Sequence, residues 1–219
     1  MTDIKVISFG FVNAFVINSS ILVDTGTKGC SKRILSKLKE FNINPSDIKL
    51  IVLTHGHDDH IGSVSQVAAA TGAKVLISKL EYEQVKHGLA DEIKPQSALM
   101  KFFYALKKNK SVVNTNPNFE ADIIIDETFD LKPYGAQGEI VLTPGHSKGS
   151  ISVLLGECAI IGDNLMAFSS KPKRPFIAYD IALIKASLND LIKRGAKKFY
   201  LSHGAVYDLD PIEEALLNL

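Results

Sequence analysis

The sequence predicts an α+β fold in which two β-sheets pack together and helices cover their outer faces. Near the start, short apolar runs are broken by glycine and by polar turns, which is typical of an antiparallel meander. A set of strands followed by helices then occurs twice along the chain, and this order implies two packed sheets with helices outside. The chain has 219 residues and is 46% apolar, which is enough for the core of one domain or at most two.

The first part of the chain alternates clearly between strands and helices. Residues 31–41 have helical spacing, because Ile34, Leu38 and Phe41 share one face. Gly72 is a typical end of a second helix. We therefore predict, in order, strands at residues 4–9, 14–17 and 21–23, a helix at 31–41, a strand at 48–53, a helix at 61–71 and a strand at 74–78.

The later part of the chain repeats this order after a different middle segment. Its predicted elements are strands at residues 139–142, 150–155 and 158–161, a helix at 181–194, a strand at 198–201 and a short helix at 211–217. Residues 80–110 are charged and mostly helical in pattern, with a break at Lys94-Pro95. We interpret residues from about 80 to 118 as a mostly helical insertion into a single domain, 1–219. This insertion either covers or borders the functional site, or forms a solvated helical pair far from it.

Composition and charge exclude several classes of protein. The net charge is only +1, whereas a broad nucleic-acid surface normally needs a strong basic excess. Cys30 and Cys158 are too few for a disulfide framework and fit a reducing compartment. No early segment resembles a signal peptide, and no apolar run approaches the ~20 residues of a membrane helix. We therefore expect a cytoplasmic protein with no nucleic-acid or membrane partner.

The most informative segment is the run His-Gly-His-Asp-Asp-His at residues 55–60, called here the HGHDDH run. It follows the strand predicted at 48–53, so one strand delivers several metal-binding side chains to one loop. Neutral imidazole binds borderline metals, and a carboxylate adds a charged oxygen. Four side chains of the run are therefore predicted to bind metal: His55, His57, Asp59 and His60.

Three further side chains occupy the same kind of position downstream. His146, Asp163 and His203 each follow a predicted strand and precede a turn rich in Gly, Ser or Asn. Ligands at strand ends can converge on one site. His87 is the exception, because it lies in the charged helical segment, and we predict that it is a surface residue.

With these residues, the sequence resembles the metallo-β-lactamase superfamily of binuclear hydrolases. The HxHxDH signature at residues 55–60, the Asp-Thr-Gly turn at Asp24, and His146, Asp163 and His203 occur in the family's order and cover nearly the whole chain. The resemblance implies the metallo-β-lactamase fold, a four-layer αββα sandwich with the site at one edge of the two sheets. This fold agrees with the α+β pattern described above.

The resemblance also implies two divalent metal ions as cofactors, most simply zinc, with manganese or iron as alternatives. Asp163 would bridge the ions, which can share a hydroxide when they lie ~3.5–4 Å apart. Asp59 would also be catalytic, orienting the hydroxide or accepting its proton. The remaining ligands would divide between the ions, with His55, His57 and His146 on one, and Asp59, His60 and His203 on the other.

Two roles stay open for Asp24, which either fixes a ligand histidine by a hydrogen bond or only closes the turn before Thr25-Gly26.

Two interpretations also stay open for the basic loop after Asp163. Its side chains could hold a substrate carboxylate or phosphate, or could simply face solvent. The predicted substrate contacts are Lys171, Lys173, Arg174 and, in place of a tyrosine found in related lactonases, Tyr179.

Within the superfamily, Asp163 counts against a true β-lactamase, which generally lacks a bridging carboxylate there. The resemblance is nearer to the glyoxalase II-like branch, but the chain has little room after His203 for the helical domain that binds glutathione. We expect hydrolysis of an ester-like bond in a small molecule: a thioester, a lactone or a phosphodiester.

Two other classes of function stay open. One is a mononuclear iron enzyme resembling persulfide dioxygenases, which use a two-His-one-carboxylate site. The other is a non-catalytic relative that only binds its ligand. The complete second ligand set favours the hydrolase. A homodimer is also possible, because it is common among the relatives.

Overall fold

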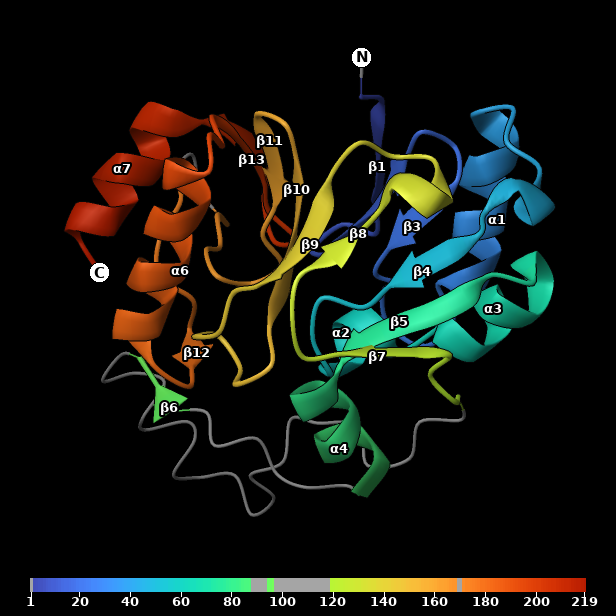
Figure 1. Ribbon diagram of the computed structural model, residues 1–219, viewed down its shortest axis with the longest axis horizontal. Helices are drawn as coiled ribbons and strands as arrows, with labels where there is room; N and C mark the ends of the chain where they lie inside the picture. The colour runs from blue at the N-terminus through green and yellow to red at the C-terminus, as the bar shows by residue number, and fades with distance from the viewer. Residues whose placement is uncertain (1, 88–93, 97–118, 169–170) are drawn as a thin grey trace.

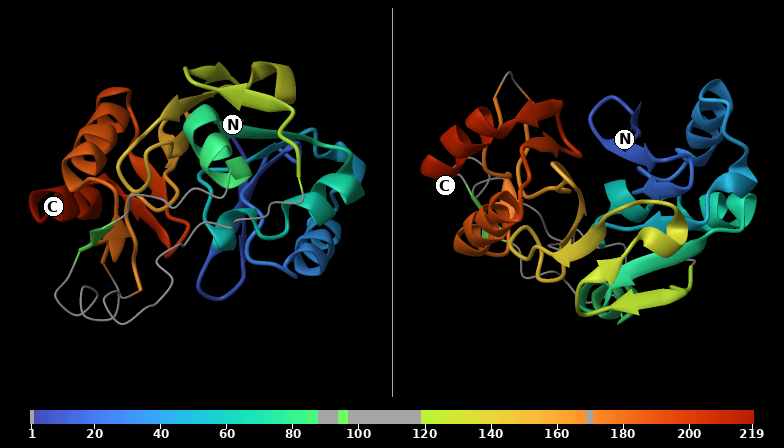
Figure 2. Two further views of the ribbon diagram at one scale, coloured as in Figure 1. Left: turned by 90° about the horizontal axis from the view of Figure 1, so that it is seen from below. Right: turned by 45° about the horizontal axis from the view of Figure 1, so that its top comes forward.

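The computed structural model describes residues 2–87, 94–96, 119–168 and 171–219. Two six-stranded sheets lie face to face at the centre, and helices cover the outer side of each sheet (Figure 1, Figure 2). The layers run helix, sheet, sheet, helix, so the predicted αββα sandwich is confirmed. No helix in the described ranges is both long enough and apolar enough to span a membrane.

The first sheet has the order β1-β2-β3-β4-β5-β7. Its elements, with the helices between them, are β1 (Ile4–Ser8), β2 (Asn13–Ile17), β3 (Ile21–Val23), α1 (Ser31–Glu40), η1 (Pro45–Asp47), β4 (Leu50–Val52), α2 (Asp58–Ile61), α3 (Val64–Thr71), β5 (Lys74–Ser78) and β7 (Ile123–Ile125). The strands β1, β2 and β3 pair antiparallel, and β3, β4, β5 and β7 pair parallel. The parallel strands have their carboxyl ends at one edge of the sheet, and the HGHDDH run follows β4 at that edge.

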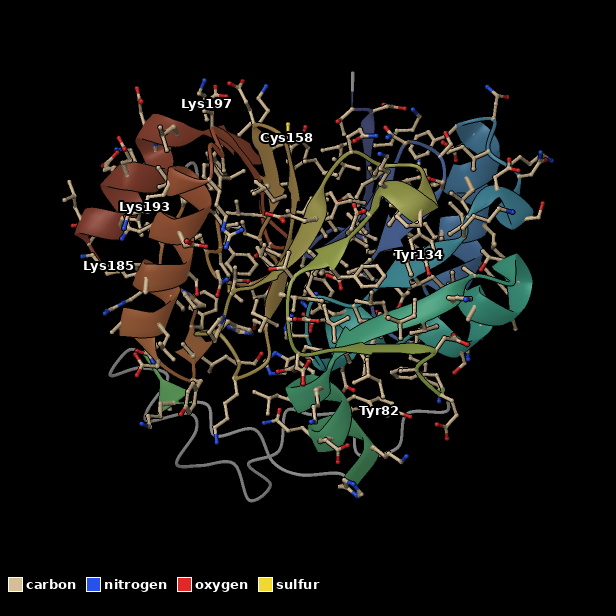
Figure 3. The ribbon with its side chains drawn as sticks, in the orientation of Figure 1. Tyr82, Tyr134, Cys158, Lys185, Lys193 and Lys197 are labelled. Carbon is tan, nitrogen blue, oxygen red and sulfur yellow. The ribbon has the colours of Figure 1, made fainter. Side chains whose placement is uncertain are left out.

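The second sheet has the order β14-β13-β11-β10-β9-β8. Its elements, with the neighbouring helices, are β8 (Phe129–Asp130), η2 (Lys132–Tyr134), β9 (Glu139–Leu142), β10 (Ile151–Leu155), β11 (Cys158–Ile160), α6 (Ile181–Lys193), β13 (Lys198–Tyr200), β14 (Val206–Asp208) and α7 (Leu209–Leu217). Helix α6 starts where the Asp180 side chain accepts from the backbone N–H groups of Ala182 and Leu183. Its exposed face carries Lys185 and Lys193 (Figure 3).

Strand β2 shows how the layers are held together. Ala14 and Val16 belong to the buried cluster beneath α1 and α3, whereas Phe15 and Ile17 belong to the cluster between the two sheets. Successive side chains of a strand point to opposite faces, and both faces of β2 are covered. This explains why the strand is apolar throughout most of its length. Cys158 packs against the cluster between the sheets.

The helix predicted at residues 61–71 starts later than predicted, as α3 at Val64. Gly62 and Ser63 separate it from α2, which ends at Ile61. A Cβ at Gly62 would lie 2.4 Å from the backbone nitrogen of Lys28. The adjacent Ser63 hydroxyl donates to the Thr27 carbonyl at 2.7 Å. The loop before α1 therefore touches the chain at this point, and a residue with a side chain at Gly62 would not leave room for it.

The predicted insertion is described only in part. Its first segment is α4 (Lys79–His87), which is not a solvated helix, because Glu81, Tyr82 and Val85 are buried. The predicted break at Lys94-Pro95 is strand β6 (Lys94–Pro95), which pairs with β12 (Ile177–Ala178). Residues 97–118 lie outside the described residues. His87 is exposed, as predicted.

Candidate metal centre

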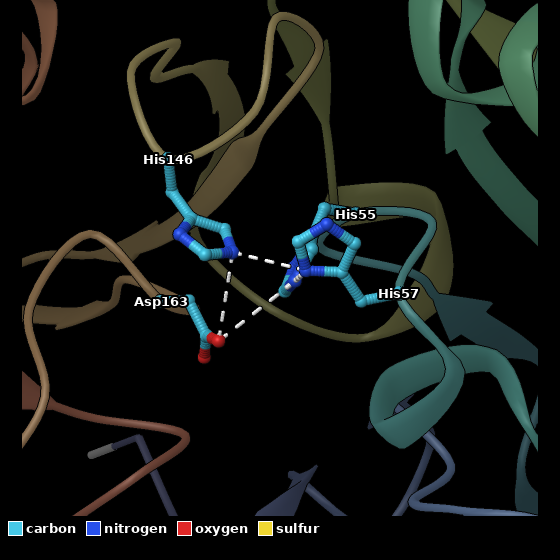
Figure 4. Close-up of side chains that lie close together, drawn as sticks. All are labelled: His55, His57, His146 and Asp163. Carbon is cyan, nitrogen blue, oxygen red and sulfur yellow. Dashed lines mark hydrogen bonds and ion pairs between the residues drawn. The ribbon is translucent and has the colours of Figure 1, made fainter. Parts of the chain in front are cut away.

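All seven predicted ligands lie together at one edge of the two sheets. They form two groups, and within each group one possible ligand atom per residue lies within 4.8 Å of the others. Both sheets contribute to the first group, whose side chains converge in Figure 4. The first group is His55, His57, His146 and Asp163, and the second is Asp59, His60 and His203.

The ends of four strands explain this convergence. After β4, the HGHDDH run turns into α2, where His57 is the residue before the helix and Asp59 and His60 lie in its single turn. In the second sheet, His146, Asp163 and His203 follow β9, β11 and β13. The prediction that these strand ends meet is therefore correct.

In the first group, three imidazoles and one carboxylate face a common point. The Nδ1 atom of His57 lies 3.0 Å from His55 Nε2 and 3.1 Å from His146 Nε2. The Oδ2 atom of Asp163 lies 3.6 Å from His146 Nε2 and 3.9 Å from His55 Nε2. This is a closed set of nitrogen and oxygen donors of the kind that holds a divalent ion.

Asp163 also belongs to the second group by distance. Its Oδ1 atom lies 3.4 Å from His60 Nε2, and its Oδ2 atom lies 3.3 Å from His203 Nε2. Asp59 closes this group, with Oδ2 at 3.1 Å from His203 Nε2. The Asp163 carboxylate therefore lies between the two groups.

Two buried atoms at this junction indicate that the residues fit a metal. His60 Nε2 and Asp163 Oδ1 lie 3.4 Å apart, and neither makes a hydrogen bond to another atom in the described part of the chain. A buried polar atom left without a partner costs about 1–3 kcal/mol. A cation between these atoms would satisfy both, and imidazole with carboxylate suits zinc, manganese or iron.

The charges in the centre are strongly coupled. Burial, and then the neighbouring His60 and His57, lower the pKa of His55 well below its usual value. Burial also disfavours charge on His60 and His203. For His60 the carboxylates of Asp163 and Asp24 outweigh burial, and its pKa lies well above normal. For His203 the carboxylates of Asp163 and Asp59 outweigh burial and raise the pKa to about 10. Burial raises the pKa of Asp163, but His60 and His203 outweigh it and hold that pKa well below its usual value. Without metal, His60 and His203 therefore carry protons that a metal must displace.

Asp24 contacts a ligand directly. Its Oδ2 accepts from His60 Nδ1 at 2.8 Å, and its two oxygens accept from the backbone N–H and the hydroxyl of Thr54, each at 2.8 Å. Asp24 is fully buried and has a left-handed backbone, with φ of 62°. It both shapes the turn and orients His60, so that the Nε2 atom faces Asp163.

Backbone carbonyls orient two other ligands. His203 Nδ1 donates to the Phe11 carbonyl at 2.6 Å, and His146 Nδ1 donates to the Ile177 carbonyl at 3.1 Å. Each bond leaves the Nε2 atom directed at the centre. The Phe11 ring also stacks on His203, with ring centroids 5.9 Å apart.

The predicted substrate contacts do not gather around the ligands as one set. Lys171 pairs with Glu214 of α7 at 2.7 Å, and Lys171, Lys173 and Arg174 line a surface cavity beside that helix. Tyr179 is nearer to the centre, because its backbone N–H donates to the His146 carbonyl at 2.9 Å. The basic groups remain a prediction as substrate contacts.

Sequence reasoning assigned no role to Glu81 in the metal centre, although this residue touches two of the ligand loops. It lies in the segment interpreted as a charged insertion, where an acidic residue resembles a solvated one. The short spacing between the preceding strand and Glu81 is a signal that could have placed this residue near the metal centre. β5 ends at Ser78, so Glu81 lies in the first turn of a helix at the same sheet edge as the HGHDDH run.

Comparison with known proteins identifies the family. The sequence profile described as the metallo-beta-lactamase superfamily matches residues 7–203. The chain belongs to this superfamily. The expectation of a metal-dependent hydrolase is thereby confirmed at the level of the superfamily, and the His and Asp groups are its metal-binding cluster.

Two curated proteins from Methanocaldococcus jannaschii are similar in sequence to this chain. The probable metallo-hydrolase MJ0888 is 29% identical over 94% of this chain and 94% of its own length. The probable metallo-hydrolase MJ0296 is 31% identical over 65% of this chain, and the match spans half of that longer protein.

Solved structures of other superfamily members have the same fold. ST1585 from Sulfolobus tokodaii, described as an archaeal metallo-beta-lactamase superfamily protein, superposes with a TM-score of 0.67 at 21% identity. The match covers all of this chain and 86% of that one. TTHA1429 from Thermus thermophilus gives a TM-score of 0.64 at 20% identity over 99% of this chain and 77% of that one. At this identity the likeness concerns the fold alone.

Proposed function

We propose that the protein is a binuclear metal-dependent hydrolase that cleaves an ester-like bond in a small molecule. The observation that carries the proposal is the position of Asp163, whose carboxylate lies between two complete groups of donors. A single-metal centre would not need the second group. The two relatives named probable metallo-hydrolases support the same reaction class.

In this proposal the three imidazoles of the first group, His55, His57 and His146, would hold one ion. The second group would hold the other, and Asp163 would serve both. Zinc is the proposed metal. When bound, the ions would lower the pKa of a coordinated water towards ~7 and so supply a hydroxide at neutral pH. Asp24 and two backbone carbonyls orient the imidazoles of His60, His146 and His203, so these three are positioned before substrate arrives.

Asp59 is the proposed proton acceptor. Its side chain is 27% exposed, whereas the other six ligands are at most 5% exposed. It is therefore the ligand nearest to solvent, where substrate enters. Burial raises the pKa of Asp59, but the His203 imidazole at 3.1 Å outweighs burial and lowers that pKa. Asp59 is thus ionised at neutral pH and able to orient the attacking water and take its proton.

Elemental analysis with turnover assays tests this function. The protein as isolated should contain about two zinc or manganese ions per chain and hydrolyse at least one model thioester, lactone or phosphodiester. Asp59→Asn, loaded with zinc until its metal content matches that of wild type, should lose turnover. About one iron per chain, with oxygen consumption in the presence of a persulfide, would replace the proposal by the dioxygenase alternative.

The finer properties of the enzyme are part of the same proposal. A thioesterase of the glyoxalase II-like branch agrees with the carboxylate at Asp163. A cytoplasmic location agrees with the sequence composition. Neither nucleic acid nor membrane is a proposed partner, and light scattering tests whether the chain forms a homodimer.

A further inference from the structure

Helix α4 carries a buried carboxylate that belongs to neither metal group. Glu81 is 1% exposed, whereas the side chain of Glu83, two residues further along the same helix, is 53% exposed. Burying a carboxylate is costly unless its oxygens accept hydrogen bonds. The burial of Glu81 therefore raises the question of what its two oxygens bind.

Each oxygen of Glu81 accepts a hydrogen bond from a different ligand loop. Oε2 accepts from the backbone N–H of Gly56 at 2.7 Å, inside the HGHDDH run. Oε1 accepts from the backbone N–H of Gly149 at 2.9 Å, three residues after His146. The first loop belongs to the first sheet and the second loop to the second sheet, so one carboxylate joins two halves of the molecule.

The surrounding contacts fit this arrangement closely. The Ser78 hydroxyl donates to the Gly149 carbonyl at 2.6 Å, so both polar backbone groups of Gly149 are bound from the start of α4. A Cβ at Gly149 would lie 2.8 Å from the Glu81 backbone nitrogen, and a Cβ at Gly56 would lie 2.6 Å from Val85 Cγ2. Only glycine allows both loops to approach the helix so closely.

We propose that Glu81, assisted by Ser78, is a positioning residue for the first metal group. Its carboxylate fixes the separation between the HGHDDH run and the His146 loop, and so brings the three imidazoles of that group to one point. This inference rests on the metal centre of the proposed function. It extends that proposal, because Glu81 acts through backbone groups and is not itself a ligand.

The substitution Glu81→Gln isolates this role. Glutamine has nearly the same shape, but it offers one acceptor oxygen and one NH₂ donor. Two backbone N–H groups face this side chain, so one of them must then meet a donor and lose its bond. Glu83→Gln is the matched control, because it makes the same chemical change on the exposed face of the same helix.

The experiment compares cobalt binding by metal-free wild type, Glu81→Gln and Glu83→Gln. Circular dichroism first establishes that each metal-free protein is folded. Calorimetric titration then gives the affinity of each ion, and the visible absorption of bound Co²⁺ gives its coordination geometry. In Glu81→Gln, one ion should bind about 10-fold or more weakly with an altered spectrum, and Glu83→Gln should match wild type. Wild-type affinity and spectrum in Glu81→Gln would overturn the inference.

Ser78→Ala gives a second test if Glu81→Gln does not fold. It keeps the carboxylate and removes only the hydroxyl that holds Gly149. The expected result is a smaller loss of affinity for one ion, with a shifted Co²⁺ spectrum, and wild-type values would again overturn the inference. Turnover by the wild type is measured separately. If the hydrolase proposal fails, the metal-binding result for Glu81→Gln can still be interpreted.

Discussion

The Asp163 carboxylate and the imidazoles around it determine how the centre responds to protons. Asp163 is buried and ionised, and it raises the pKa of His60 and of His203. In the metal-free protein His60 and His203 therefore hold protons where a cation would bind, and the neighbouring carboxylates balance their charge. Protons and metal compete for the same nitrogen atoms.

This competition predicts that metal affinity rises with pH. The pKa of His203 is about 10 without metal, so its imidazole is protonated at pH 7, whereas a ligand imidazole must be neutral. As the pH rises towards 10, that proton is lost and the competition weakens. Zinc titrations at pH 6, 7.5 and 9, in buffers of different ionisation enthalpy, should show proton release and tighter binding at higher pH. Binding that is independent of pH would contradict the assigned charges.

A second prediction at the residue scale concerns Asp24. Asp24→Asn should weaken metal binding by about 10–100-fold, because loss of a carboxylate that orients a ligand imidazole typically has this effect. Asp58→Asn is the control inside the HGHDDH run, because Asp58 is exposed and belongs to neither ligand group. Dialysis against a competing chelator measures both. Equal affinities in the two variants would assign Asp24 to the turn alone.

At the scale of single elements, a substitution at the break between α2 and α3 tests how much close packing there contributes to stability. Gly62→Ala would place a Cβ 2.4 Å from the backbone nitrogen of Lys28, and such crowding typically costs about 1–3 kcal/mol. Gly72→Ala is the comparison, because Gly72 has a positive φ but open space around it, so only the backbone cost of a left-handed alanine, about 1–2 kcal/mol, applies. Thermal unfolding of both variants should show the larger loss for Gly62→Ala. The reverse order would show that the two helices can move apart.

The sequence predicts individual elements unevenly, for physical reasons. The HGHDDH run is recognisable because four metal-binding side chains within six residues, directly after an apolar strand, rarely occur together unless they bind a metal. The gap between α2 and α3 was missed, because the apolar pattern continues through Gly62 and the contact that breaks the helix comes from Thr27 and Lys28. Glu81 was missed because its partners are backbone groups of remote loops, which local sequence does not reveal.

At the scale of the whole molecule, the two sheets share the metal centre. His55, His57, Asp59 and His60 come from the first sheet, and the remaining ligands come from the second. A ligand that binds only the folded state stabilises it, by ~2.7 kcal/mol at a concentration 100 times its Kd. Removing metal with a chelator should therefore lower the melting temperature of the entire protein, and adding zinc should restore it. An unchanged melting temperature would mean that the sheets are held together without the ions.

The layer architecture was predictable because each half of the chain alternates strands and helices with apolar faces of the matching period. The contacts between the halves were not predictable in this way. The Asn13 side chain donates to the carbonyls of Leu201 and Gly204, at 3.2 and 2.8 Å, and so ties β2 to the loop of His203. An asparagine at the start of an apolar strand gives no local sign of such a partner.

The order of the ligands along the chain has a consequence for how the protein matures. Four ligands occupy six adjacent residues early in the sequence, but His146, Asp163 and His203 follow much later. While the chain is still being synthesised, the early run can offer a metal only part of its final coordination. Tight capture by all seven ligands would therefore require the second sheet to have formed and docked. A fully coordinated metal would then report that both halves have been assembled.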